Sequence, residues 1–141
     1  MSAYPDTSLL FSWYLPDQHA QAADRLMRGR PSLAVTPFHH AELANALFQW
    51  VFRGKLSKDE ALLAYSSFEQ DCESGIFLTH AVPESAYLLS VDLAERHVPA
   101  LGVRTLDTLH VAAALELGAY VFWSFDQRQA ALARAAGLTT N

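Results

Sequence analysis

Cysteine and long apolar runs are both scarce in this 141-residue chain, and their scarcity narrows what the protein can be. The single cysteine, Cys72, excludes an internal disulfide, and no Cys-x-x-Cys pair is present for zinc or redox chemistry. Residues 1–14 lack the basic start of a secretory signal, and the most apolar stretch, 111–123, is too short to span a bilayer. We therefore expect a cytoplasmic protein without a membrane segment.

Basic residues are also few, with 10 Lys and Arg against 15 Asp and Glu and a net charge of −5. This balance argues against nucleic-acid binding through a broad basic surface, because that mode needs many cations to displace counterions. It leaves room for catalysis on a nucleic acid through a bound metal and a few arginines. No repeat, low-complexity run or linker interrupts the chain, so we expect a single domain over residues 1–141.

Short apolar segments alternate with helical patterns along the chain. Strands are predicted at 4–6, 32–35, 76–79, 120–123 and 138–139, and helices at 9–15, 18–27, 37–52, 58–73, 83–96, 106–117 and between 126 and 137. This alternation is typical of a parallel sheet with helices on both faces. The predicted fold is α/β, a three-layer α/β/α sandwich around a sheet of four or five parallel strands.

The residues before each predicted helix indicate how it begins. Thr7 and Ser8 are expected to cap the first helix, Thr105 the helix at 106–117, and Asp126 the last one. Residues 99–104, which begin with a proline, are expected to form a loop.

Four acidic residues, Asp6, Glu42, Asp107 and Asp126, lie where predicted strands end or helices begin. In a parallel α/β sheet these boundaries converge at the carboxyl edge of the strands. Carboxylates gathered there repel one another unless a hard divalent cation neutralises them. The pattern therefore indicates a metal-dependent hydrolase of phosphate esters.

Each acid also has a structural interpretation that remains open. Asp6 and Asp126 could serve as helix caps, and Asp107 could interact with its helix dipole. Glu42 could be an ordinary solvated glutamate. His110, one turn after Asp107, could donate a hydrogen bond to it or be a core histidine.

Four segments carry a resemblance to a known family: 6–10 (DTSLL), 36–47 (TPFHHAELANAL), 104–114 (RTLDTLHVAAA) and 124–129 (SFDQRQ). Together they resemble a PIN-domain ribonuclease, and among these the VapC-type toxins of bacterial toxin–antitoxin pairs. The resemblance extends over nearly the whole chain. The ordered set of four segments is more specific than any one of them.

The resemblance implies a sheet whose first strand is central. It implies Mg²⁺ or Mn²⁺ held by Asp6, Asp107 and Asp126, with Glu42 completing the site. It also implies an RNA substrate, a homodimer and a cognate antitoxin protein.

Four further residues are expected to support such a site. Thr7 and Ser124 are expected to orient carboxylates, and Arg104 and Arg128 to steer the phosphate backbone. Pro5 lacks the amide donor of a central strand, although a terminal strand position would tolerate it.

Other classes fit less well. A receiver domain would need paired acids after the first strand and a late lysine, whereas the only lysines are Lys55 and Lys58. An aspartate-nucleophile phosphatase would need a second aspartate where Ser8 stands. His39, His40 and His110 match no familiar zinc spacing. The main alternative is a catalytically degenerate PIN-like domain that binds RNA or protein without cleaving.

Overall fold

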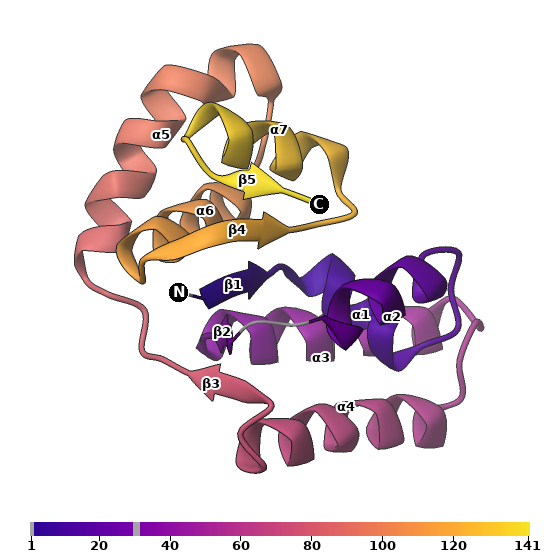
Figure 1. Cartoon of the computed structure of the whole chain (residues 1–141). Helices are drawn as coiled ribbons and strands as arrows, with labels where there is room; N and C mark the ends of the chain where they lie inside the picture. Colours follow the sequence, from indigo (N-terminus) through magenta and orange to yellow (C-terminus); the bar gives the residue numbers. More distant parts are fainter. Residues whose placement is uncertain (1, 30–31) are drawn as a thin grey trace.

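The computed structural model describes residues 2–29 and 32–141 (Figure 1). In chain order the elements of these residues are β1 (Ser2–Pro5), α1 (Thr7–Tyr14), α2 (Ala20–Arg28), β2 (Ser32–Val35), α3 (Pro37–Phe52), α4 (Lys58–Glu73), β3 (Phe77–Thr79), α5 (Ser85–Leu101), α6 (Thr105–Glu116), β4 (Ala119–Trp123), α7 (Gln127–Ala135) and β5 (Thr139–Thr140). No helix in this part of the chain is both long and apolar enough to cross a membrane.

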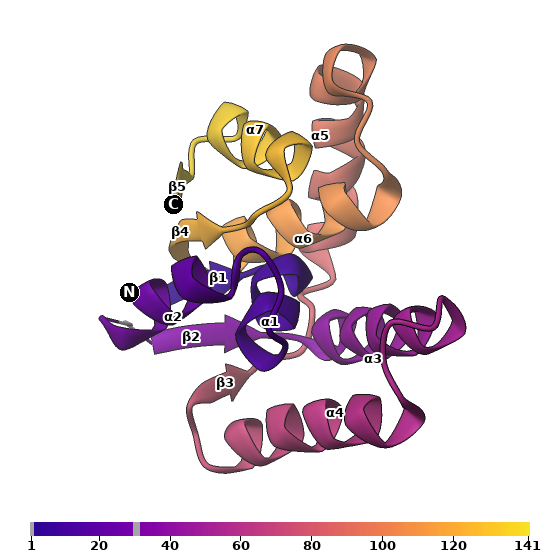
Figure 2. The same cartoon turned by 90° about the vertical axis from the view of Figure 1, so that its right-hand side faces the viewer.

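The five strands form one parallel sheet in the order β3-β2-β1-β4-β5, so β1 is central (Figure 2). Ala3 of β1 pairs with Leu33 of β2 on one side and with Val121 of β4 on the other. Because every strand is parallel, all carboxyl ends lie at one edge. The predicted α/β fold and the central first strand are both confirmed.

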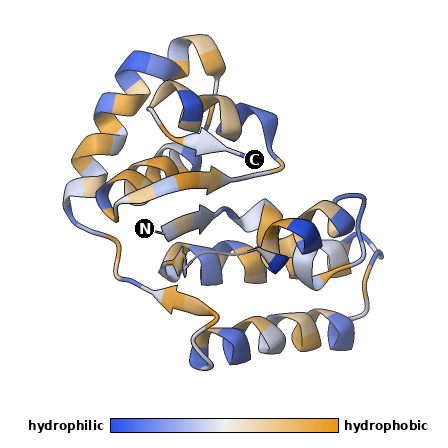
Figure 3. Ribbon diagram, in the orientation of Figure 1, coloured by the Kyte–Doolittle hydropathy of each residue, from blue (hydrophilic) through white to orange (hydrophobic). Residues whose placement is uncertain are grey.

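Alternate residues of the central strands enter two cores, one on each face of the sheet. Ala3, Val121 and Trp123 pack with α1 to α4, whereas Tyr4 and Phe122 pack with α5 to α7. Hydrophobic and hydrophilic residues are interspersed along the helices around the sheet (Figure 3). The alternation of strand residues between the two cores follows from the two-residue period of a strand and produces the three layers of the sandwich.

Two helices begin differently from the prediction. Asp6 rather than Thr7 or Ser8 is the N-cap of α1, and its carboxylate accepts the Leu9 N–H at 3.1 Å. Helix α6 already includes Thr105, and Arg104 precedes it as the N-cap residue. There the Asp107 carboxylate reaches back to the Arg104 N–H at 2.9 Å. Asp6 therefore has the capping role that the sequence analysis left open beside Thr7 and Ser8, and Asp107 bonds to the residue before its helix, where Thr105 was expected as the cap.

Helix α5 continues through Pro99 to Leu101, so the predicted loop at 99–104 is wrong for its first three residues. A proline in the last turn removes only one backbone hydrogen bond. The helix ends at Gly102, whose φ of 66° is left-handed and whose N–H donates to the Val98 carbonyl at 2.8 Å. Glycine adopts this conformation without the strain a side chain would add.

Candidate active site

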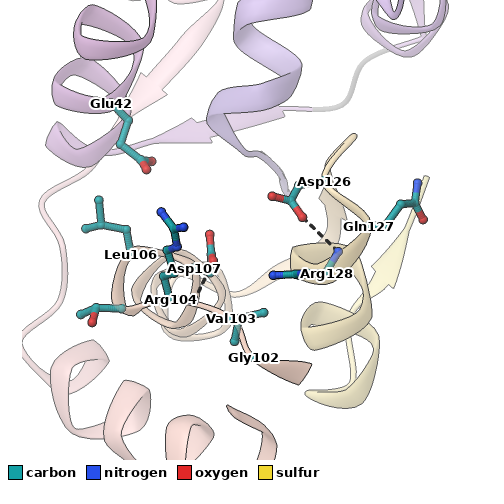
Figure 4. Close-up of a pocket in the computed structure, with 10 residues that line it drawn as sticks. Glu42, Gly102, Val103, Arg104, Leu106, Asp107, Asp126, Gln127 and Arg128 are labelled. Carbon is teal, nitrogen blue, oxygen red and sulfur yellow. Dashed lines mark hydrogen bonds between the residues drawn. The ribbon is translucent and has the colours of Figure 1, made fainter. Parts of the chain in front are cut away.

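Three of the four predicted acids line one cavity at the carboxyl edge of the sheet. The cavity has a volume of about 700 Å³, and Glu42, Asp107 and Asp126 contribute to its wall. Glu42 extends from α3 toward α6, Asp107 projects from α6, and Asp126 precedes α7 (Figure 4). Residues far apart in the sequence therefore meet here, as the strand-end argument predicted.

Each of these three carboxylates is held by the protein through one oxygen. Oδ1 of Asp126 accepts the N–H groups of Arg128 and Gln129 at 3.0 and 3.2 Å, which confirms the predicted cap of α7. Oδ2 of Asp107 accepts the Arg104 N–H. Oε1 of Glu42 accepts the Thr7 hydroxyl at 2.8 Å and also contacts His110. Within the described residues, the second oxygen of each acid makes no hydrogen bond to the protein, so it can accept from a ligand.

Asp6 does not line this cavity. It is 1% exposed, and both of its oxygens are engaged. Oδ1 accepts the Ser8 hydroxyl at 2.5 Å and the Leu9 N–H, while Oδ2 accepts the Ser124 hydroxyl at 2.6 Å. Burial raises the pKa of Asp6, and these three hydrogen bonds oppose that rise by stabilising the ionised form.

Ser124 and Ser8 connect Asp6 to the turn that carries Asp126. The Ser124 hydroxyl accepts the Asp126 N–H at 3.0 Å while it donates to Asp6. The Ser8 hydroxyl accepts the Phe125 N–H at 3.0 Å while it too donates to Asp6. The buried aspartate therefore fixes the β4–α7 turn. Ser124 donates to the Asp6 carboxylate, and the matching contact of Ser8 was not foreseen.

His110 orients Glu42 from inside the core. A carboxylate can only accept, so the Nε2 of His110 carries the proton that it donates to Glu42. Nδ1 of His110 lies 2.7 Å from the Tyr4 hydroxyl oxygen, so the other side of the ring is hydrogen-bonded to Tyr4. His110 and Tyr4 are both almost fully buried. Of the two interpretations of His110, a donor to Asp107 is wrong, because its hydrogen bond goes to Glu42, and a core histidine is confirmed by its burial.

The electrostatic environments of Glu42 and Asp107 differ. Burial acts to raise the pKa of Glu42, but the hydrogen bond and charge of His110 and the Thr7 hydroxyl outweigh it, so the pKa is lowered. Burial raises the pKa of Asp107, and the charges of Asp126 and Glu42 raise it further against the opposing Arg104 N–H. The cavity acids therefore repel one another at neutral pH.

Arg104 and Arg128 lie on the wall of the same cavity, beside Asp107 and Asp126 respectively (Figure 4). Both are exposed, and within the described residues neither guanidinium forms an ion pair with a carboxylate. Two cationic groups that border an acidic cavity suit an anionic ligand.

The donor set suits a hard divalent cation, because every candidate ligand is a carboxylate oxygen. The charges of Asp126 and Glu42 help to raise the pKa of Asp107, and a bound cation would relieve this repulsion between the carboxylates. In the ranges 2–29 and 32–141, however, no three Asp, Glu, His or Cys side chains form a ready-made metal site. The residues have the ligand chemistry that a divalent cation needs, and the cavity carboxylates would have to move closer together to hold one.

The three histidines considered for zinc serve other purposes. His39 accepts the Thr36 N–H with Nδ1 at 2.8 Å, and its Nε2 lies 2.7 Å from the Pro5 carbonyl oxygen. His40 contacts the Tyr65 hydroxyl at 3.2 Å. Pro5 is the last residue of β1, the terminal position at which a missing amide donor is tolerated, and its carbonyl oxygen is the one that His39 contacts.

Solved structures with a similar fold come from several organisms. Mycobacterium tuberculosis VapC20, a Sarcin-Ricin loop cleaving toxin, superposes with a TM-score of 0.72 at 18% identity, covering 98% of this chain and 97% of that one. VapBC-1 from nontypeable Haemophilus influenzae gives 0.64 at 16% identity, covering 100% and 97%. FitAcB from Neisseria gonorrhoeae gives 0.62 at 13% identity, covering 98% and 95%. These similarities show a shared fold.

Among curated proteins, no sequence matches this chain. The sequence model of the PIN domain, in contrast, matches residues 3–135, which is nearly the whole chain and includes all four acids. The protein belongs to the PIN domain family.

Proposed function

We propose that the protein is an endoribonuclease that depends on Mg²⁺ or Mn²⁺ and acts as the VapC-type toxin of a toxin–antitoxin pair. The observation that supports it most is the cavity at the sheet edge, where Glu42, Asp107 and Asp126 each have one anchored oxygen and one free oxygen. Membership of the PIN domain family and the fold shared with a Sarcin-Ricin loop cleaving toxin agree with this assignment.

The cation would be held by Asp107 and Asp126, with Glu42 and Asp6 completing the acidic set. When bound, it would supply Lewis acidity toward the phosphodiester oxygens and positive charge beside the leaving oxygen. Glu42, whose pKa is lowered, is ionised at neutral pH and can accept a proton from the attacking water at Oε2. The water oxygen would bond to phosphorus as the P–O3′ bond breaks, and the 3′-oxygen would take up a proton from solvent, so that one product ends in a 3′-hydroxyl and the other in a 5′-phosphate.

The remaining site residues position these groups. Thr7 fixes Glu42 through Oε1, and Ser124 fixes Asp6 and the turn before α7. Arg104 and Arg128 border the cavity and would hold the phosphate oxygens of the RNA. This arrangement needs only local positive charge, which agrees with a net charge of −5.

We also propose two protein partners, a second copy of this chain and a cognate antitoxin. The resemblance to VapC-type toxins supports both. Co-expression with the product of a neighbouring short gene, followed by purification and an RNA cleavage assay, would test the antitoxin. Inhibition that is reversed when the two proteins are separated is the expected result.

The central test is an RNA cleavage assay on Asp107→Asn and Asp126→Asn, each with Mg²⁺, with Mn²⁺ and with EDTA. Loss of a carboxylate that binds the ion should reduce cleavage by at least about 100-fold, and EDTA should abolish cleavage by the wild type. Asp92→Asn is the matched control, because Asp92 is an exposed aspartate paired with Arg96 on α5. Full activity in both site variants would eliminate the proposed mechanism.

A domain that binds RNA or protein without cleaving is the second candidate. The observation in its favour is that, within the described residues, no three ligating side chains stand together as a metal site. Titration with Mn²⁺ separates the two candidates. A saturable rise in melting temperature that is lost in Asp107→Asn supports the nuclease, whereas no response together with RNA binding supports the binding domain.

A further inference from the structure

A second cavity adjoins the acidic one and has a different character. Its volume is about 390 Å³, and it lies between α1, α3 and the turn before α7. Thr7, Ser8 and Asp126 line it on the side of the acidic site. Asp126 lines both cavities, so a ligand in one would be a direct neighbour of a ligand in the other.

Aromatic rings supply much of the wall. The rings of His19 and Phe125 are stacked, with centroids 4.6 Å apart and an interplanar angle of 10°. Phe11 and Trp50 meet edge to face at 4.7 Å. Nucleobases bind to such rings by stacking, which contributes independently of sequence because every base has a flat π face.

One charged acceptor lies among these rings. Oδ2 of Asp17 accepts the Ser12 hydroxyl at 2.8 Å, and Oδ1 accepts the His19 N–H at 2.9 Å. A carboxylate has about four acceptor positions, so roughly two remain for a ligand. These suit the amino and imino protons on the edge of guanine. Uracil offers a single N–H beside two carbonyl oxygens that a carboxylate repels.

We propose that this cavity, which we call the base pocket, holds one nucleobase of single-stranded RNA beside the phosphodiester to be cleaved, and that Asp17 favours guanine over uracil. The proposal rests on the proposed ribonuclease function for its biological meaning. The shared wall at Asp126 supports RNA over an apolar peptide, because a nucleotide with its phosphate at the acids has its base within reach. Lys55, whose Nζ lies 5.1 Å from the centroid of the Trp50 ring, adds a cation near this side of the pocket.

The test uses the uncharged nucleosides guanosine and uridine as probes, in EDTA, with binding measured by saturation-transfer NMR. Neither cleavage nor metal is needed, so the result is independent of whether the protein is a nuclease. Guanosine should bind the wild type about tenfold more tightly than uridine, and Asp17→Asn should remove that difference. His19→Ala and Phe125→Leu should weaken guanosine about tenfold.

Phe52→Ala is the matched control, because Phe52 is an aromatic residue of α3 that is 88% exposed and lies outside the base pocket. Thermal melting checks that each variant is folded. If Phe125→Leu proves to be unfolded, His19→Ala alone is sufficient to test the stacking. The proposal is overturned if neither nucleoside binds the wild type, or if the pocket variants bind as the control does. It is also overturned if those variants weaken only association with a co-expressed antitoxin, because the cavity is then a protein-docking site.

Discussion

His39 makes the stability of this fold depend on pH in a way that can be isolated. The side chain is fully buried, with its two ring nitrogens bonded to the Thr36 N–H and the Pro5 carbonyl. The Thr36 N–H can only donate, so Nδ1 must be unprotonated and the ring neutral. Burial lowers the pKa of His39 well below its ordinary value near 6.5, and the charge of His110 adds to that lowering.

The direction of this pH dependence follows from which state, folded or unfolded, binds the proton. The unfolded chain takes up a proton at His39 as the pH falls through about 6.5, whereas the folded chain does not. The stability that His39 contributes is therefore present above that pH and is lost as the pH falls. Between pH 7.5 and pH 5.5, one such group should reduce the free energy of unfolding by about 1.4 kcal/mol.

The substitution that isolates this effect is His39→Gln. Position 39 is the third helical residue after the Thr36 N-cap, where glutamine is a standard partner in a capping box. The glutamine amide can accept from Thr36 and donate to Pro5, but it does not titrate. The helix start should therefore survive while the loss of stability on the acid side becomes about 1.4 kcal/mol smaller.

Urea unfolding at several pH values, in EDTA and followed by circular dichroism, measures both proteins under the same conditions. The contributions of the other histidines and of the site acids are common to both proteins, so they cancel in the difference between the free energies of unfolding of wild type and variant. A parallel pH dependence in the two proteins would refute the reasoning, because it would mean that His39 takes up its proton in the folded state.

Three further predictions concern the acids and the residues that hold them, each measured by urea unfolding in EDTA. Asp107→Asn should stabilise the protein by about a few tenths of a kcal/mol at pH 7, after allowance for solvent screening. Burial, followed by the charges of Asp126 and Glu42, raises the pKa of Asp107. The Asp107 side chain therefore contributes favourably to the free energy of unfolding at low pH and loses this contribution as the pH rises. The stabilisation by Asp107→Asn should accordingly vanish at low pH. Ser8→Ala should cost about 1–3 kcal/mol, because it leaves the Phe125 N–H without its acceptor and removes one of the two donors to Oδ1 of Asp6, and Ser8→Thr should recover part of that loss. Tyr4→Phe should cost about 1–2 kcal/mol, because the Nδ1 of His110 then lacks its hydrogen-bond partner, and equal stability of the two proteins would mean that the contact contributes nothing.

The architecture was predictable because its signals are local. The apolar segment 32–35 and the Thr36-Pro37 helix start gave β2 and α3 at their observed bounds. Ser57 and Glu60 form a capping box, with contacts of 3.0 Å in each direction, at the start of α4. Such boundaries depend on the chemistry of a few adjacent residues, which the sequence displays directly.

The contacts within the site were less predictable because they join residues far apart in the chain. His110 is three residues from Asp107, and a helical turn places them near each other, so a mutual hydrogen bond was a reasonable expectation. Its actual partner is Glu42, on a different helix. The stacking of His19 on Phe125 likewise depends on the path of two separate turns. No local pattern contains that information.

Capping and metal binding by these acids are compatible, although the sequence analysis treated them as alternatives. In a parallel sheet the helix that follows a strand begins at the carboxyl edge, so an acid that caps it is already at the edge where ligands bind. A cap occupies one carboxylate oxygen, and Asp107 and Asp126 keep the other free toward the cavity. Asp6 differs, because Ser124 holds the oxygen that its cap leaves over. An ion bound by Asp6 would have to share that oxygen with the Ser124 hydroxyl and reach a side chain that is 1% exposed, whereas one bound by the other two acids would not. Among the three acids at helix starts, the capping geometry thus assigns the lower cost of binding an ion to Asp107 and Asp126 and the higher cost to Asp6.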